Sequence, residues 1–254
     1  YTLSLHDALP ILSLQERSWS DMKLYHVYAI LRKQLKDTLR NKPTLVQFVM
    51  FPAIAAVLTL SAGEFQLPQR YFVNLFAVMY VCMAPILILS AVISEEKEKG
   101  SLRMLMMSNV KPMEYLLGIG VYVFVLCMAG VLFMGLLGKF SMQELMMFLL
   151  LNACGILISS IIGALIGVVS DNQTAASGLS VPAMLITSFI PMLSMFNASI
   201  RNVGKFLYSQ QIYEQINNGA TIVLSAQSFA VVLVNFAAVL ILYVYMYRKK
   251  QLLA

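Results

Sequence analysis

The sequence has few charged residues. Of its 254 residues only 12% are Asp, Glu, Lys or Arg, whereas 59% are hydrophobic and the mean hydropathy is +0.77. A water-soluble domain carries about a quarter charged residues, and a disordered chain combines low hydrophobicity with high charge. The composition therefore excludes both classes and indicates a protein that is dissolved in a membrane.

Charge is absent from six long stretches of the chain. After Lys42 the uncharged windows cover residues 43–63, 71–94, 115–138, 145–170, 172–200 and 215–247. A helix needs about 20 mostly apolar residues to cross a hydrocarbon core of about 30 Å. A single Lys or Arg at mid-bilayer costs roughly 2.5–3.5 kcal/mol. We therefore predict an all-α integral membrane fold with six transmembrane helices over residues 43–254.

Groups that could support catalysis or a metal site are also scarce. His6 and His26 are the only histidines, both ahead of the first predicted span, and no window contains Asp or Glu. An intramembrane hydrolase would need a nucleophile next to a base, so we do not expect an enzyme. Cys82, Cys127 and Cys154 lie inside windows without metal-type spacing, and we expect them to be buried apolar fillers.

Basic residues fall mainly on one side of the predicted membrane. With the N-terminus in the cytoplasm, thirteen Lys and Arg residues after residue 21 lie inside and four lie outside. This asymmetry agrees with the enrichment of cytoplasmic loops in Lys and Arg, and six spans return the C-terminus to the same side. We predict cytoplasmic termini and the lipid bilayer as the partner of the positive charge, with no nucleic-acid partner.

The first residues differ from the rest of the chain. Residues 1–21 lack the basic start of a signal peptide. The string from Tyr1 to Ile11 resembles a translated sequencing adapter. We interpret residues 1–21 as a non-native leader and expect the native chain to begin at Met22.

Two segments outside the spans are amphipathic. Residues 22–42 repeat apolar side chains at steps of three and four beside Lys and Arg, and Pro43 follows. This pattern predicts a basic helix in the membrane interface, with a plain cytoplasmic helix as the alternative. Residues at about 199–216 predict one outer amphipathic helix. Its apolar stripe comprises Ile200, Val203, Phe206, Leu207 and Tyr213.

The loop between the second and third windows has charged residues followed by apolar ones. The run Glu95-Glu96-Lys97-Glu98-Lys99 precedes Gly100, and the strip after it contains Leu102, Met104, Leu105, Met106 and Met107. A solvated loop has no reason to expose such a strip, and Met suits a surface that must fit a partner. The strip is either a short helix that docks into a soluble protein or a helix end that enters the interface, and composition does not decide between them.

These segments together resemble the type-2 export permease family of ABC transporters. The resemblance lies chiefly in Ile93-Ser94-Glu95-Glu96-Lys97-Glu98-Lys99-Gly100-Ser101-Leu102, followed by Val110-Lys111-Pro112 and Tyr115-Leu116-Leu117-Gly118. It covers about residues 22–254. It implies a multi-pass permease subunit of an ATP-driven exporter in a bacterial inner (plasma) membrane. In that family residues 22–42 would form the connecting helix, and residues at about 95–107 the coupling helix that touches the ATPase.

The resemblance also implies partners and coupling residues. The coupling residues would be Glu95, Glu98, Gly100, Leu102, Arg103, Met104, Met106 and Asp171. No Gly-x-x-x-x-Gly-Lys-Ser/Thr pattern occurs, so ATP would bind a separate cytoplasmic ABC ATPase subunit and no cofactor is expected in this chain. Because two six-span units are needed for a pathway, a second permease copy, identical or related, is expected.

The same resemblance places the second and fifth spans at a central cavity. The candidates for lining it are Asn74, Met83, Thr187, Ser188 and Met192, and ordinary helix packing is the alternative for each. Because the spans carry no ionisable group, the expected cargo is amphipathic or apolar, such as a drug, a peptide antibiotic or a lipid-like molecule. A secondary carrier and a non-transporting membrane scaffold are the alternative functions.

Overall fold

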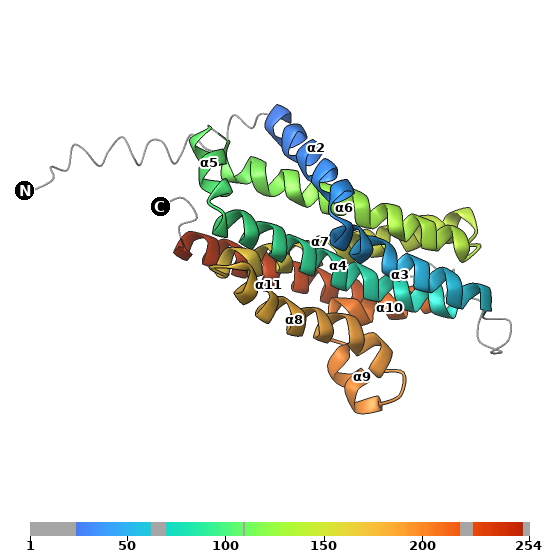
Figure 1. The fold of residues 1–254 in the computed structure, drawn as a ribbon. Helices are drawn as coiled ribbons and strands as arrows, with labels where there is room; N and C mark the ends of the chain where they lie inside the picture. Colours follow the sequence, from blue (N-terminus) through green and yellow to red (C-terminus); the bar gives the residue numbers. More distant parts are fainter. Residues whose placement is uncertain (1–23, 62–69, 109, 219–225, 251–254) are drawn as a thin grey trace, which may run out of the picture.

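The computed structural model describes residues 24–61, 70–108, 110–218 and 226–250, and over these ranges it contains helices and no strand (Figure 1). Six of the helices are long and apolar enough to cross a membrane. They are α3 (Lys42–Ser61), α4 (Tyr71–Glu98), α6 (Pro112–Leu137), α7 (Met142–Val169), α8 (Gln173–Leu193) and α11 (Ala226–Lys250). The predicted all-α fold with six membrane helices is thus confirmed, whereas the predicted orientation of the termini stays a prediction. Residues 1–21, interpreted as a leader, lie outside the described residues.

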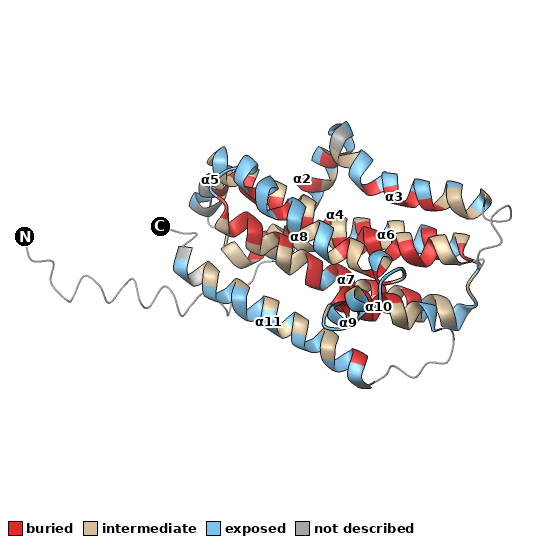
Figure 2. Ribbon diagram, turned by 90° about the horizontal axis from the view of Figure 1, so that it is seen from below, coloured by how far each residue is buried: buried red, intermediate tan, exposed pale blue. Residues whose placement is uncertain are grey.

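Helix α4 forms the centre of the bundle. In its most apolar stretch 72% of the residues are buried inside the chain, against none in the corresponding stretch of α11 (Figure 2). The α4 helix packs against α3, α6, α7 and α8. A helix that is apolar on all sides and surrounded in this way belongs to the core, so a displacement of α4 would reach every neighbouring span.

The α4–α7 contact is close because α7 has glycines along it. A Cβ atom added to Gly163 would lie 2.7 Å from the carbonyl oxygen of Pro85, and one added to Gly167 would lie 2.7 Å from the Cβ of Ile93. Small residues at such positions let two helix backbones approach within a membrane. The two helices therefore form one tightly packed pair.

The cysteines only partly match the expectation of buried fillers. Cys82 and Cys127 are buried, as expected, but Cys154 is exposed. It lies on a face of α7 that the described helices of this chain do not cover. Apolar sequence alone does not distinguish such a face from the core, because both are free of charge in a membrane protein.

The segment predicted as one outer helix is two short helices, α9 (Ala198–Gly204) and α10 (Tyr208–Asn217). The extended backbone of Leu207 separates them, and α10 packs among α4, α7, α8 and α11. Tyr208 and Ile212, one helical turn apart, are 2% and 1% exposed, whereas Val203 and Phe206 of the predicted stripe are largely exposed. The structure therefore replaces the single helix predicted over about 199–216 by an exposed helix and a buried one.

Candidate functional site

The candidate site lies at the end of the bundle where α5 (Ser101–Met107) follows α4. We call it the α5 end (Figure 1). The last turn of α4, the first turns of α6, the end of α7 and the end of α11 meet here around a small apolar pocket. Its lining is Ile93, Leu102, Pro112, Tyr115, Leu116, Val168 and Tyr247. Four helices therefore converge on α5, which lies in the segment that the sequence analysis singled out.

Helix α5 is anchored on one side and exposed on the other. Gly100 turns the chain into α5 with a left-handed φ of +69°, a conformation that glycine adopts without the steric cost of a side chain. Leu102 is 5% exposed and belongs to the core, whereas Met104 and Met107 are 59% and 74% exposed. The predicted residues Arg103 and Met106 lie in α5, but their side chains are outside the described ones. The α5 helix thus presents two flexible Met side chains from a fixed base.

The carboxylate of Glu96 faces inward and connects α4 to α2 (Leu24–Arg40). Glu96 is 8% exposed. It accepts hydrogen bonds from Lys33 Nζ at 2.7 Å and from Gln34 Nε2 at 3.0 Å. A charged group in such a position is stabilised by an opposite charge and by hydrogen bonds. Glu96 therefore fixes the middle of α2 against the end of α4.

The next two charges of the run connect α4 to the α7–α8 turn. Lys97 Nζ donates to the carbonyl oxygens of Val168 at 2.9 Å and Ser170 at 2.5 Å, at the end of α7. The carboxylate of Glu98 accepts from the backbone N–H of Gln173, the first residue of α8, at 2.9 Å. The positive charge of Lys97 thus lies at the C-terminal end of α7 and the negative charge of Glu98 at the N-terminal end of α8, where the helix dipoles favour them. The predicted coupling residue Asp171 is exposed in this same turn, so it lies close to the segment at about 95–107 that is predicted to touch the ATPase.

The remaining pair of the run stays at the surface. Lys99 Nζ forms an ion pair with the carboxylate of Glu95 one helical turn earlier. This hydrogen bond and the charge of Glu95 raise the pKa of Lys99. Both residues lie at the end of α4, so the pair does not join one helix to another, and both side chains are accessible to water.

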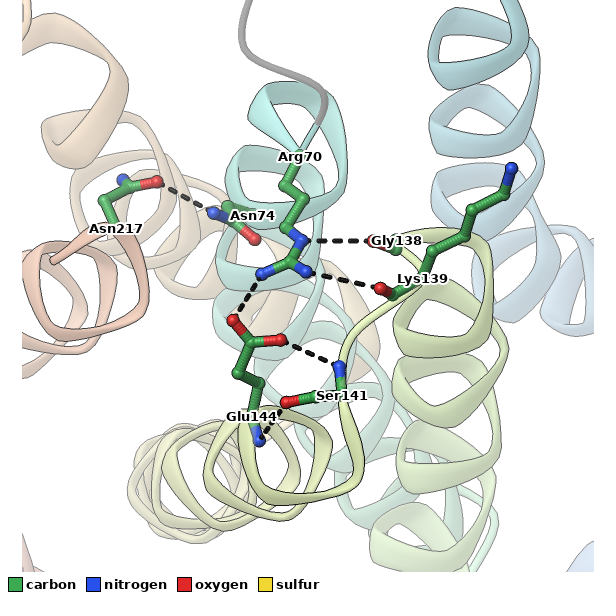
Figure 3. A network of polar contacts seen from close by, with 7 residues as sticks. All are labelled: Arg70, Asn74, Gly138, Lys139, Ser141, Glu144 and Asn217. Carbon is green, nitrogen blue, oxygen red and sulfur yellow. Dashed lines mark hydrogen bonds and ion pairs between the residues drawn. The ribbon is translucent and has the colours of Figure 1, made fainter. Parts of the chain in front are cut away.

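A second polar cluster lies at the opposite end of α4, and we call it the Arg70 end (Figure 3). The guanidinium of Arg70 donates to the carbonyl oxygens of Gly138 and Lys139, both at 3.2 Å, and pairs with Glu144 at 2.8 Å. Glu144 also accepts from the backbone N–H of Ser141 at 2.7 Å. Arg70 therefore holds the turn between α6 and α7 against the start of α4.

The chain matches the family described as "ABC-2 family transporter protein" over residues 17–247. The match covers nearly the whole chain, including the converging helices at the α5 end. The protein belongs to the ABC-2 transporter family. No curated protein sequence matches it at a significant level. With its six apolar helices, this ABC-2 family member is a multi-pass membrane protein and a transport permease. The match also includes the end of the segment 1–21, whose interpretation as a leader stays a prediction.

Two of the residues predicted to line a cavity, Asn74 and Ser188, make their polar contacts within this chain. Asn74 is buried and donates to the Oδ1 of Asn217 at the end of α10 at 2.8 Å. Ser188 is fully buried and donates to the carbonyl oxygen of Met184 at 2.5 Å. Packing within one subunit is sufficient to explain the burial of Asn74 and Ser188. The other candidates keep part of their surface and stay predictions: Met83, Thr187 and Met192.

Sequence reasoning missed the inward-facing residues of the ABC-2 permease's α5 end. Glu96 follows the buried Ile93 by three residues and so continues the buried face of α4, a signal that the sequence contains. His26 Nδ1 of α2 lies 2.7 Å from the buried carboxylate of Glu114 in α6. Nothing in the sequence pairs these two residues, because they are 88 positions apart.

Proposed function

We propose that this permease is the membrane subunit of an ATP-driven exporter in a bacterial plasma membrane and that a separate ABC ATPase docks on α5. The observation that carries the proposal is the exposed pair Met104 and Met107 on a helix whose Leu102 is buried. A helix that is anchored in the core can pass a displacement by its partner on to the spans, whereas a loosely attached helix would move by itself. Members of this family typically work with an ABC ATPase, and in this arrangement the permease chain itself has no catalytic role.

The contacts at the α5 end provide a route for the coupling. Coupling between ATP and cargo requires two states that each ligand distinguishes. Glu96, Lys97 and Glu98 connect the base of α5 to α2, α7 and α8 respectively. A displacement of α5 by the ATPase would therefore act on three helices together and on the central α4.

The charge distribution supports an amphipathic or apolar cargo. The uncharged windows of the sequence contain the middle of every described span. A pathway for a small ion usually contains ionisable groups within the membrane. We propose that two copies of the permease, or this chain and a related one, enclose the pathway. Vesicles containing the permease and its ATPase would move such a cargo with ATP, and movement of a simple ion alone would contradict this choice.

The docking proposal is tested by substituting an exposed Met at each end of the bundle. We expect M107E to weaken binding of the ATPase, measured by co-purification, by about fivefold or more, since losing a central interface residue costs more than about 1 kcal/mol. M142E is the matched control, because Met142 is also 74% exposed but begins α7 near the Arg70 end. Co-purification should survive in M142E. If M107E retained the ATPase as fully as M142E does, the docking surface would lie elsewhere.

A further inference from the structure

Helix α2 lies beside the ends of the membrane spans. Only Asn41 separates it from α3, and it crosses the first turns of α6 (Figure 1). A Cβ atom added to Gly118 would lie 2.8 Å from the Cβ of Ile30, and Thr38 hydrogen-bonds the hydroxyl of Tyr122. Because α3 and α6 are spans, these contacts place α2 at the level where a span leaves the hydrocarbon region.

The side of α2 away from α6 has a stripe of cations without acidic partners. Arg32, Lys36 and Arg40 follow one another at steps of four and are exposed. Among the described residues, no acidic side chain lies within ion-pair distance of these three. Lys33 differs, because its ammonium group is paired with Glu96. The stripe is therefore available to an external anion.

Apolar side chains border this stripe on the same exposed side. Leu24, Tyr28 and Leu39 are 79%, 62% and 72% exposed. Helical spacing places Tyr28 next to Arg32, Leu39 next to Lys36, and Leu24 one turn before Tyr28. An apolar edge beside a row of cations fits a lipid surface, in which acyl chains lie directly below charged headgroups. An acidic soluble protein would complement the cations but would leave the exposed Leu side chains in water.

We propose that the α2 stripe of Arg32, Lys36 and Arg40 binds the phosphate groups of anionic phospholipids, with the acyl chains against Leu24, Tyr28 and Leu39. The permease would thereby retain anionic lipid at this helix in preference to zwitterionic lipid. The inference depends on the geometry of α2 in a membrane protein and not on the proposed docking of an ATPase to α5.

The test measures binding of fluorescent phosphatidylglycerol to the full-length permease in detergent, by polarisation. The R32Q/K36Q variant removes two cations from the stripe. Each cation near a lipid surface contributes about 1 kcal/mol, so the loss of two should lower the affinity by on the order of thirtyfold. The matched control is K139Q/K205Q, which removes two exposed cations remote from α2 and should bind as the unsubstituted chain does. Phosphatidylcholine and inorganic phosphate are measured in parallel.

Several results would overturn the proposal. One is equal affinity for phosphatidylglycerol and phosphatidylcholine. Another is an equal loss of phosphatidylglycerol affinity in R32Q/K36Q and K139Q/K205Q. A third is full competition by inorganic phosphate, which would identify a free anion as the ligand. Unchanged lipid binding with lost ATPase co-purification in R32Q/K36Q would assign the stripe to a protein partner. Should R32Q/K36Q fail to fold, salt dependence decides. Binding by the unsubstituted chain must weaken as NaCl is raised, because salt screens exposed charges, and a salt-independent affinity would contradict the proposal.

Discussion

The two ends of α4 are held by polar clusters of different design. At the Arg70 end the guanidinium of Arg70 contacts one turn, between α6 and α7, and Asn74 one helical turn later separately joins α4 to Asn217 of α10 (Figure 3). At the α5 end three successive residues each contact a different helix: Glu96 contacts α2, Lys97 contacts α7 and Glu98 contacts α8. The Arg70 side chain thus fastens a single turn, whereas Glu96, Lys97 and Glu98 together would distribute a movement of the chain over three helices.

This difference fits the proposed docking of the ATPase at the α5 end. The α5 end also presents the exposed Met104 and Met107, while at the Arg70 end the cationic group is covered by carbonyl oxygens, by a carboxylate and by the ring of Phe140 at 4.5 Å. A fixed turn at one end and a branched set of contacts at the other suits a bundle that pivots. Substitutions at the two ends should therefore separate stability from coupling.

The largest expected effect is that of E96A. Removing this carboxylate leaves Gln34 buried without its acceptor and Lys33 without its partner, so the free energy of unfolding should fall by about 2 kcal/mol. Stimulation of the ATPase by cargo should fall as well, because α2 is no longer fixed to α4. Thermal unfolding in detergent and ATPase assays in vesicles measure the two quantities.

The control for E96A is E144A at the Arg70 end, which removes the ion pair with Arg70. It should lower the unfolding temperature but leave the ratio of stimulated to basal ATPase activity unchanged. Equal loss of stimulation in E96A and E144A would contradict the proposed division of roles between the two ends.

A smaller effect is expected from G100A at the turn into α5. The added methyl group would meet no atom within 4 Å, so only the φ of +69° opposes it. A non-glycine residue in this conformation costs about 1–2 kcal/mol. G120A in α6 is the matched control, because its methyl group would also meet nothing within 4 Å but its backbone is helical, where Ala is favoured. G100A should lower the unfolding temperature and G120A should not, whereas equal temperatures would show that α5 tolerates another turn.

Much of the fold could be predicted because the membrane makes charge informative. The uncharged windows gave the number and approximate positions of the spans, since a charge inside a bilayer is costly. The same reasoning failed for α10, a helix that carries Ser209, Gln210 and Gln211 and is nonetheless buried. Two of its side-chain amides donate inside the protein: Gln211 to the carbonyl oxygen of Lys205 and Gln210 to the carboxylate of Glu214, both at 2.7 Å. The polar sequence of α10 therefore did not indicate that this helix is buried.

The sequence predicted a docking segment, which stays a prediction, but it did not predict the contacts that hold this segment in the fold. The charged run and the Met strip indicated where a partner could dock, because both are unusual next to spans. Helical spacing after Ile93 could have indicated that Glu96 faces inward, but nothing in the sequence indicates which residues Glu96 and Lys97 contact. Their partners Lys33 and Val168 are 63 and 71 positions away, and only the folded arrangement of α2, α4 and α7 brings them together.

The smallest effect should come from K99Q, at the one pair of the charged run that joins no other helix. Lys99 and Glu95 are both accessible to water, and exposed ion pairs contribute little because solvent screens them and side-chain freedom is lost. We expect no measurable change in the unfolding temperature at neutral pH, in low or high salt. Because the pair raises the pKa of Lys99, whatever stability it contributes is present at neutral pH and is lost as the pH rises through that raised pKa. A clear destabilisation by K99Q at neutral pH would mean that the surface pair, and not only Glu96, Lys97 and Glu98, holds the α5 end together.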